Sequence, residues 1–158
     1  MGTDQQLSAG RTALAEVLAK VSSGFGLACE VNVSADADGE LSATLDGDGA
    51  DALVGRGGSV IDALQYLASQ IVSRAEGGGR HRVLLDAGGY RARREAALID
   101  LADRAATEAL EFGEEIELDA MTPHDRRIVH MALKDRTDVV TRSEGEEPRR
   151  RIVVEPAD

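Results

Sequence analysis

The spacing of apolar residues changes twice within the first half of the chain, and this change restricts the fold more than any other feature. Leucines and valines recur three and four positions apart in residues 7–21, which predicts an amphipathic helix. Residues 27–34 and 41–45 then alternate apolar and polar side chains, as half-buried strands do. Asp and Gly at 36–39 favour a turn between them. The sequence therefore predicts a helix followed by a β-hairpin.

A glycine turn separates two further helical stretches. A short helical segment is predicted over 48–54, and it ends in Gly55-Arg56-Gly57-Gly58. A longer helix with a broad apolar face follows, and Gly77-Gly78-Gly79 closes that region. The apolar run at 83–85 predicts a strand. The predicted order of elements over residues 7–86 is therefore helix, strand, strand, helix, glycine turn, helix and strand.

The rest of the chain predicts a second small module over residues 87–155. Thr122 is expected to cap a helix that has Pro123 at its first position. The fold class is therefore α+β, with two modules in series. The elements expected in the second module are a long helix at 91–112, a strand at 115–118, a helix to about 134, and strands at 137–142 and 149–154.

Composition limits both the core and the kind of binding surface. Hydrophobic residues make up 42% of the chain but aromatic residues only 3%, and Trp is absent. The core must therefore be aliphatic, and binding through broad aromatic platforms is not expected. Cys29 is the single cysteine, so no internal disulfide can form, which suits the reducing cytoplasm. It falls on an apolar strand face and is expected to be a buried thiol.

The formal net charge is −11, which at first opposes binding to phosphate-rich ligands. The charge is unevenly spread, however. Residues 1–52 hold nine acidic and two basic side chains, whereas residues 121–154 hold eight basic and six acidic ones. Basic residues also cluster at 80–94 and 149–151. Because local fields govern binding, the overall acidity does not exclude a nucleic-acid partner.

The glycine turn is the first candidate site. Glycines allow a tight turn and let another backbone approach closely, and the following helix directs its positive end and its free amides toward the turn. Arg56 adds a charged donor for a phosphodiester. Ser59 is expected to cap the helix, with Asp62 at its third position. The alternative is a plain helix-joining turn. A Walker loop is excluded because Gly58 is followed by Ser59 and not by the lysine that this motif requires. A dinucleotide fingerprint starting at Gly55 is excluded because its sixth position, which must be glycine, is Val60.

The order of elements over 7–86, together with Gly55-Arg56-Gly57-Gly58 and its flanking Val54 and Ile61, resembles a prokaryotic-type KH domain. In that family the glycine turn clamps the nucleic-acid backbone and the bases lie in an adjoining apolar groove. The resemblance implies that the turn and Ser59 contact a nucleic-acid strand.

The second candidate site is Arg126-Arg127-Ile128-Val129-His130. Arg126 and His130 lie four apart on an expected helix and share one face, where a guanidinium and an imidazole together can grip a phosphate. The alternative is two solvent-facing polar residues. Residues 119–133 and the turn at 143–150 resemble an R-3-H domain. By that resemblance Arg126 and His130 belong to a second nucleic-acid surface, with Arg127, Arg93 and Arg150 beside it.

Both motifs in this order, with the joint at 89–95, resemble the Jag (SpoIIIJ-associated, or KhpB) family. Many members carry an additional N-terminal Jag-N domain, for which this chain has no room before residue 7. The resemblance implies a cytoplasmic, non-catalytic protein that binds single-stranded RNA. It also implies an RNA chaperone or regulator linked to cell elongation and division, sometimes with a small KH-only partner. Single-stranded DNA is a further ligand for the second module.

No cofactor, metal site or membrane insertion is expected. The three histidines, at 81, 124 and 130, lack the spacing of a zinc site, and no nucleophile with a base and an orienting group is visible. No apolar run approaches the roughly 20 residues that span a bilayer. Two other classes remain open: a protein-interaction adaptor with a secondary nucleic-acid surface, and a nuclease.

Overall fold

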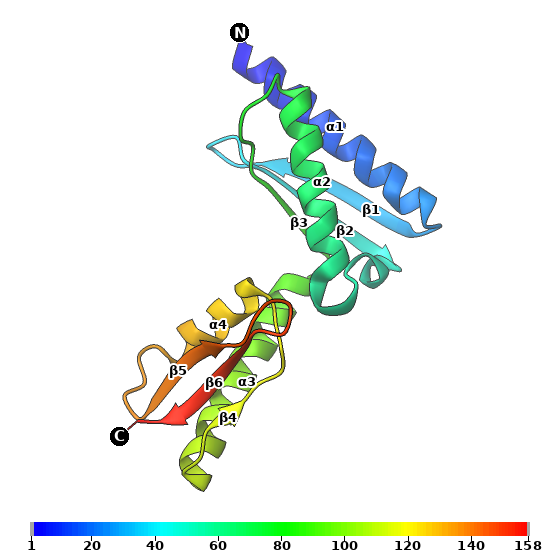
Figure 1. Cartoon of the computed structure of the whole chain (residues 1–158). Helices are drawn as coiled ribbons and strands as arrows, with labels where there is room; N and C mark the ends of the chain where they lie inside the picture. The colour runs from blue at the N-terminus through cyan, green and yellow to red at the C-terminus, as the bar shows by residue number, and fades with distance from the viewer. Residues whose placement is uncertain (1, 158) are drawn as a thin grey trace. The chain divides into compact units, whose positions relative to one another are not determined.

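The structure is a computed structural model that describes residues 2–157, and for residues 2–8 it describes the backbone only. The chain folds into two compact units, Met1–Arg91 and Ala92–Asp158 (Figure 1). Sequence patterns place the division at residue 86. The later division has a physical cause, because Arg91 Nε donates a 2.6 Å hydrogen bond to the Leu85 carbonyl and so belongs to the first unit. Both units mix helices and small sheets, which confirms the α+β class.

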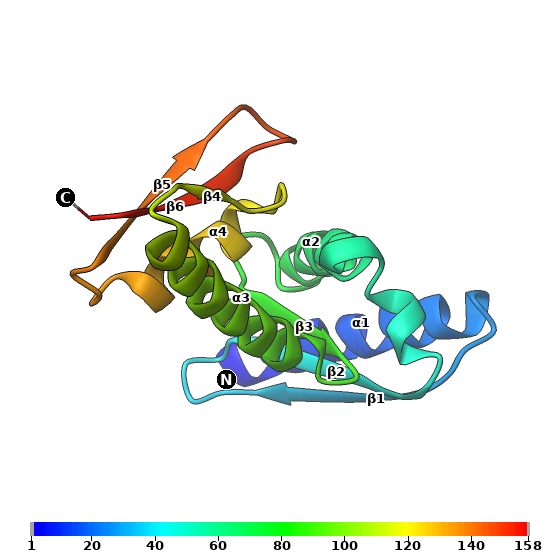
Figure 2. The same cartoon turned by 90° about the horizontal axis from the view of Figure 1, so that it is seen from below.

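The first unit has the predicted order of elements, with the helix before the glycine turn present as a short 3₁₀ helix. Strand β1 pairs antiparallel with β2 as a hairpin, and β3 pairs parallel with β2, giving the sheet order β1-β2-β3. Helices α1 and α2 lie side by side against one face of this sheet (Figures 1 and 2). The elements are α1 (Gly2–Gly24), β1 (Ala28–Ala35), β2 (Leu41–Asp48), η1 (Ala50–Leu53), η2 (Arg56–Gly58), α2 (Ser59–Ala75) and β3 (Val83–Ala87).

An aliphatic core holds the first unit together. Leu14 and Leu18 of α1, Leu45 of β2 and Ile61 of α2 are fully buried, as the helical and alternating patterns predict. Leu7 was expected on the same face, but its side chain lies outside the described residues. The prediction of a buried Cys29 is wrong. β1 is the outer strand of the sheet, so its inward side chains, Cys29 among them, are only half-buried.

The second unit also forms a three-stranded sheet, here antiparallel with the order β4-β6-β5. One core joins its helices to the sheet, with Leu98 and Ala106 of α3, Val129 of α4 and Val154 of β6. Thr122 caps α4 as predicted, accepting a 3.2 Å hydrogen bond from the Asp125 amide. The elements are α3 (Tyr90–Phe112), which begins in the first unit, β4 (Ile116–Glu117), α4 (Pro123–Leu133), β5 (Val139–Glu144) and β6 (Arg151–Pro156).

The two longest helices, α1 and α3, contain charged residues along their length. Within residues 2–157, no helix combines the length and the apolar character that crossing a bilayer requires.

Candidate nucleic-acid interface

The glycine turn has a backbone that favours glycine at three of its four positions. Gly55, Gly57 and Gly58 have φ values of 72°, 60° and 84°. A Cβ on Gly55 would lie 2.4 Å from Val60 Cγ2, and one on Gly58 would lie 2.9 Å from the Tyr90 hydroxyl. Gly57, by contrast, faces open space with no atom within 4 Å of such a Cβ. The close packing at Gly55 and Gly58 fixes the turn, and Gly57 leaves room for another chain to approach.

The backbone amides at the start of α2 were expected to be free, but the structure shows them hydrogen-bonded. The amides of Val60 and Ile61 both donate to the Val54 carbonyl, at 3.0 and 3.2 Å, and the Gly58 amide donates to the Gly55 carbonyl. The Ser59 amide donates to the Arg56 carbonyl. The expectation of free helix amides at this turn is therefore wrong for residues 58–61, because the carbonyls of Val54, Gly55 and Arg56 accept from them. Arg56 and Gly57, both exposed, remain the open part of the turn.

The residue at the N-cap of α2 is also not Ser59, the one that the sequence predicted. Gly58 occupies the N-cap position, and no side chain accepts a hydrogen bond there. Ser59 is instead the first helical residue, with φ −60° and ψ −35°. Asp62, expected to complete a capping box, accepts a 3.2 Å hydrogen bond from Arg91 Nη2. Since the buried Gly58 packs against Tyr90, the predicted contacts of Gly58 and Ser59 with a ligand stay predictions.

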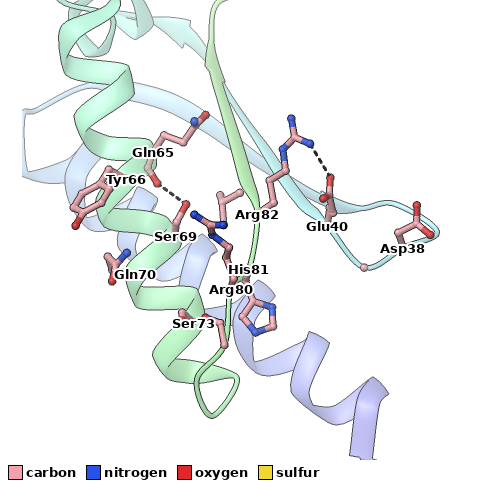
Figure 3. Close-up of a pocket in the computed structure, with 13 residues that line it drawn as sticks. Asp38, Glu40, Gln65, Tyr66, Ser69, Gln70, Ser73, Arg80, His81 and Arg82 are labelled. Carbon is pink, nitrogen blue, oxygen red and sulfur yellow. Dashed lines mark hydrogen bonds and ion pairs between the residues drawn. The ribbon is translucent and has the colours of Figure 1, made fainter. Parts of the chain in front are cut away.

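A surface groove of about 840 Å³ lies further along α2, where the helix faces β3 (Figure 3). Gln65, Tyr66, Ser69 and Ser73 line it from α2, while residues 79–82 of the loop before β3 and Val83 of β3 itself line the other side. Tyr66 is 66% exposed, so an aromatic ring is available on this surface. Asp38 and Glu40 line the groove from the hairpin turn. The groove therefore combines a ring, hydroxyls and an amide with charges of both signs.

Arg80 and Arg82 lie in the loop that lines the groove. Contacts with the C-terminal end of α2 hold this loop in place. The Glu76 carboxylate is buried, pairs with His81, and lies against Gly10 of α1. Ser73 Oγ donates a 2.6 Å hydrogen bond to the Gly79 carbonyl. These contacts hold the loop against the end of α2, so both arginines start from a fixed backbone.

The outer edge of β3 is partly closed at Leu85. Gln65 Oε1 accepts a 2.9 Å hydrogen bond from the Leu85 amide and a 3.0 Å hydrogen bond from Arg91 Nη2. Arg91 Nε also donates to the Leu85 carbonyl. Both backbone groups of Leu85 are thus satisfied within the unit, which blocks pairing of another strand at that residue.

The arginines divide into paired and unpaired groups. Most guanidinium groups in this acidic chain have carboxylate or carbonyl partners. Among residues 9–157, whose side chains the structure describes, no hydrogen bond or ion pair engages the side chains of Arg56, Arg74, Arg80, Arg127 and Arg149. Arg74 lies in the last turn of α2, where a cation stabilises the helix dipole. Arg56 and Arg80 are the unpaired cations of the glycine turn and the groove.

In the second unit, Arg126 and His130 have different surroundings. Arg126 is buried, donating hydrogen bonds of 2.7 Å to the Met121 carbonyl and 2.6 Å to Glu147 Oε1. His130 is exposed, and its Nδ1 lies 2.6 Å from Thr141 Oγ1 of β5. Joint binding of a phosphate by the two residues stays a prediction, and it requires Arg126 to exchange its internal partners.

The other basic residues expected near this site are spread over the unit. Arg127 is exposed on α4 and unpaired, and Arg93 is exposed on α3. Arg150 Nε donates a 2.9 Å hydrogen bond to Ser143 Oγ across the β5–β6 hairpin. Arg94, which sequence patterns grouped with these, binds the buried Asp125 at 2.8 Å. Only part of the predicted basic cluster is therefore open to a ligand.

Two further arginines of the second unit, Arg136 and Arg142, form ion pairs. Arg142 donates to Glu115, Glu144 and Glu155, and its pKa is raised above the ordinary value, first by the hydrogen bond to Glu115. Arg136 hydrogen-bonds Asp138, which lowers the pKa of the Asp138 carboxyl. The Arg142 pairs therefore link β5 to Glu155 of β6 and to Glu115 just before β4, whereas the Arg136 pair lies in the loop before β5. Among the side chains that the structure describes, those of residues 9–157, no group of three or more His, Cys, Asp or Glu is arranged to hold a metal ion.

Comparisons with known proteins bear on the family of the chain and on its second unit. The R-3-H domain family matches residues 96–156. A protein of Clostridium symbiosum named RNA-binding protein KhpB is 36% identical over 140 residues, which is 88% of this chain. The chain belongs to the KhpB family. Since the second unit makes up less than half of the chain, the match to this KhpB protein includes the first unit as well.

Further KhpB proteins match at similar identity. The one from Lactiplantibacillus plantarum is 38% identical over 130 residues, and the one from Bacillus subtilis is 31% identical over 110 residues. They cover 79% and 68% of this chain. The matches span 63%, 40% and 52% of the three KhpB relatives, so this chain corresponds to less than two thirds of each.

Several residues of the first groove were not singled out from the sequence. Gln65, Tyr66, Ser69 and Ser73 are spaced as one side of a helix, but polar residues on a helix surface are common and mark no site by themselves. The apolar face predicted for this helix included Leu67, but Leu67 is 56% exposed, so the sequence pattern did not separate this exposed side of α2 from its buried one.

Proposed function

We propose that this protein binds single-stranded RNA without catalysis. The observation that carries the proposal is the exposed Arg56, which has no side-chain partner among residues 9–157, beside the open Gly57, in the turn just before α2, the helix that lines the groove. The family membership supports the same ligand, since the relatives are named RNA-binding proteins.

The chemistry of the first unit suits an unstacked strand. A phosphate approaching Gly57 meets no side chain, and the Arg56 guanidinium supplies charge-assisted hydrogen bonds to it. Ser59, at the first position of α2, lies near the positive end of the helix dipole. About two helical turns further on, Tyr66 offers a ring for a base, and Ser69 and Gln70 offer hydrogen-bonding groups. Duplex RNA does not present splayed bases, so single strands are preferred.

The second unit adds a weaker surface for the same strand, or for single-stranded DNA. Its candidates are the exposed Arg127 and His130, with Arg93 and Arg150. Arg126 supports this surface through its bonds to Met121 and Glu147. Two linked sites raise affinity through effective concentration, without any new contact.

The cellular part of the proposal follows from family resemblance. We place the protein in the cytoplasm, where its single cysteine, Cys29, stays reduced. There it acts as an RNA chaperone or post-transcriptional regulator linked to cell elongation and division, in some cells with a small KH-only partner.

The test is equilibrium binding of the purified chain to four fluorescein-labelled ligands of one sequence: single-stranded RNA, duplex RNA, single-stranded DNA and a tetranucleotide. We expect fluorescence anisotropy to report the tightest binding for single-stranded RNA, with the labelled strand intact after incubation with Mg²⁺. Equal affinity for duplex and single strand, or no binding, would contradict the proposal and favour an adaptor. Strand cleavage would favour a nuclease.

A further inference from the structure

A second groove, of about 360 Å³, lies on α3 and α4 within the second unit. Its apolar part is formed by Ile99, Ile128 and Met131, and its ionisable part by Glu95, His124 and Arg127. The volume falls at the lower end of the roughly 300–1,000 Å³ found for small-ligand sites.

This groove borders the face of α4 that packs in the core: Ile128 and Ala132 are partly buried against that core, whereas His124, Arg127 and Met131 are exposed. The buried side chains of α4 are Asp125, Arg126, Val129 and Leu133. The groove residues His124, Arg127, Ile128 and Met131 follow helical spacing on another side. Ile99 and Met131 are 41% and 48% exposed, although both are large and apolar. Side chains of this kind gathered in a hollow indicate a ligand surface.

The charges around the groove point to the kind of ligand. Arg127 has no side-chain partner among residues 9–157, whereas Arg126 and Arg94 beside it are bound to carboxylates. A guanidinium next to an apolar surface suits a molecule with an anion and a flat apolar part. Glu95 supplies a hydrogen-bond acceptor, which matches the exocyclic amino group of a nucleobase.

We propose that the α3–α4 groove binds one unstacked nucleotide of a single-stranded RNA. The base lies on Ile99, Ile128 and Met131, Arg127 binds the phosphate, and Glu95 accepts from the base. The inference rests on the proposed RNA function, and it places Arg127, one of the candidate cations of the second unit, in a groove that Arg126 and His130 do not line.

The experiment uses the whole chain, labelled single-stranded RNA and matched pairs of variants. Arg127→Ala removes the phosphate contact, and Arg104→Ala removes an equally charged, exposed residue of α3 outside the groove. Ile99→Glu places a carboxylate in the groove. Leu110→Glu is its control, because Leu110 has the same 41% exposure on the same helix but does not line the groove.

We expect Arg127→Ala and Ile99→Glu each to raise the Kd roughly fivefold to tenfold, the loss expected for one charge-assisted contact, and the controls to stay within about twofold. Photocrosslinking of 4-thiouridine RNA to the parent chain should label residues 124–131, without relying on any variant. Circular dichroism checks folding.

Three results would overturn the inference while leaving RNA binding in place: unchanged affinity in both groove variants, equal losses in the controls, or crosslinks that avoid 124–131. A change in self-association on sedimentation with unchanged RNA affinity would instead make the groove a protein interface. If the parent chain does not bind RNA at all, the proposed function fails first.

Discussion

At the scale of single residues, Gly10 shows how one position of α1 serves a distant loop. Glycine inside a helix costs about 1 kcal/mol relative to alanine, so its presence requires a packing reason. A Cβ at Gly10 would lie 2.1 Å from Glu76 Oε1. The buried carboxylate therefore fits only because this helix position has no side chain. Glu76 in turn holds His81, in the loop that lines the groove.

We expect Gly10→Ala to destabilise the protein, by about 1–3 kcal/mol, because it displaces a buried and paired carboxylate. Helix propensity alone predicts the opposite sign. The control is Gly24→Ala, where a Cβ would meet nothing within 4 Å. Urea denaturation measures both variants. A Gly10→Ala protein as stable as the parent, or more stable, would show that Glu76 does not occupy this space.

At the scale of elements, the starts of α2 and α4 look alike in sequence but are built differently. Thr122 precedes a helix and caps it, whereas Ser59 is already inside its helix and Gly58 takes the cap position. A hydroxyl before an apolar stretch therefore identified one cap correctly and one wrongly. The difference is set by the left-handed Gly58, whose backbone begins the helix one residue earlier than a serine cap would.

Thr122→Ala should cost about 1 kcal/mol of stability, the usual loss for a helix cap. Ser59→Ala should change stability by less than about 0.5 kcal/mol, as for an exposed substitution outside such features. Thermal denaturation of the two variants compares them directly. Equal losses would mean that the Ser59 hydroxyl caps α2 after all.

Periodicity predicted most of the elements, because the cores are aliphatic and each helix or strand buries one regular face. Leu14, Leu45 and Ile61 are buried as expected. The same reasoning could not predict that Arg126 is buried, because its partner Glu147 lies in a hairpin turn distant in sequence. Neither could it find the α3–α4 groove, which depends on how two helices meet. Motif spacing identifies residues, but tertiary pairing decides which cations are available.

At the scale of the whole molecule, the protein is strongly acidic and yet carries local cations without partners. Its net charge of −11 opposes the approach of a nucleic acid at long range. Among the residues whose side chains the structure describes, Arg56 and Arg127 at proposed contact positions and Arg80 in the groove have no partner. The attraction between the protein and RNA should therefore come from a few contacts rather than from a broad basic surface.

Three or four such phosphate contacts predict a definite salt dependence. For single strands each contact adds about 0.7 to the slope, so log K should fall against log salt concentration with a slope of about −2 to −3. Anisotropy titrations over a series of KCl concentrations measure it. A flat response would mean that phosphates are not bound, and a much steeper one would require cations that the structure shows as paired.

The central claim, that the glycine turn binds the RNA backbone, is tested most directly by the double variant Arg56→Asp, Gly57→Asp. Asp tolerates the left-handed backbone of Gly57 better than most residues, and the site is open, so the fold should persist. The control, Arg104→Asp with Gly113→Asp, changes the net charge equally at an exposed arginine and at a left-handed, open glycine of the second unit. We predict that the first variant keeps its circular dichroism spectrum and loses at least about tenfold in affinity for single-stranded RNA, while the control stays within about threefold of the parent. A folded Arg56→Asp, Gly57→Asp protein that binds RNA as the control does would contradict the claim.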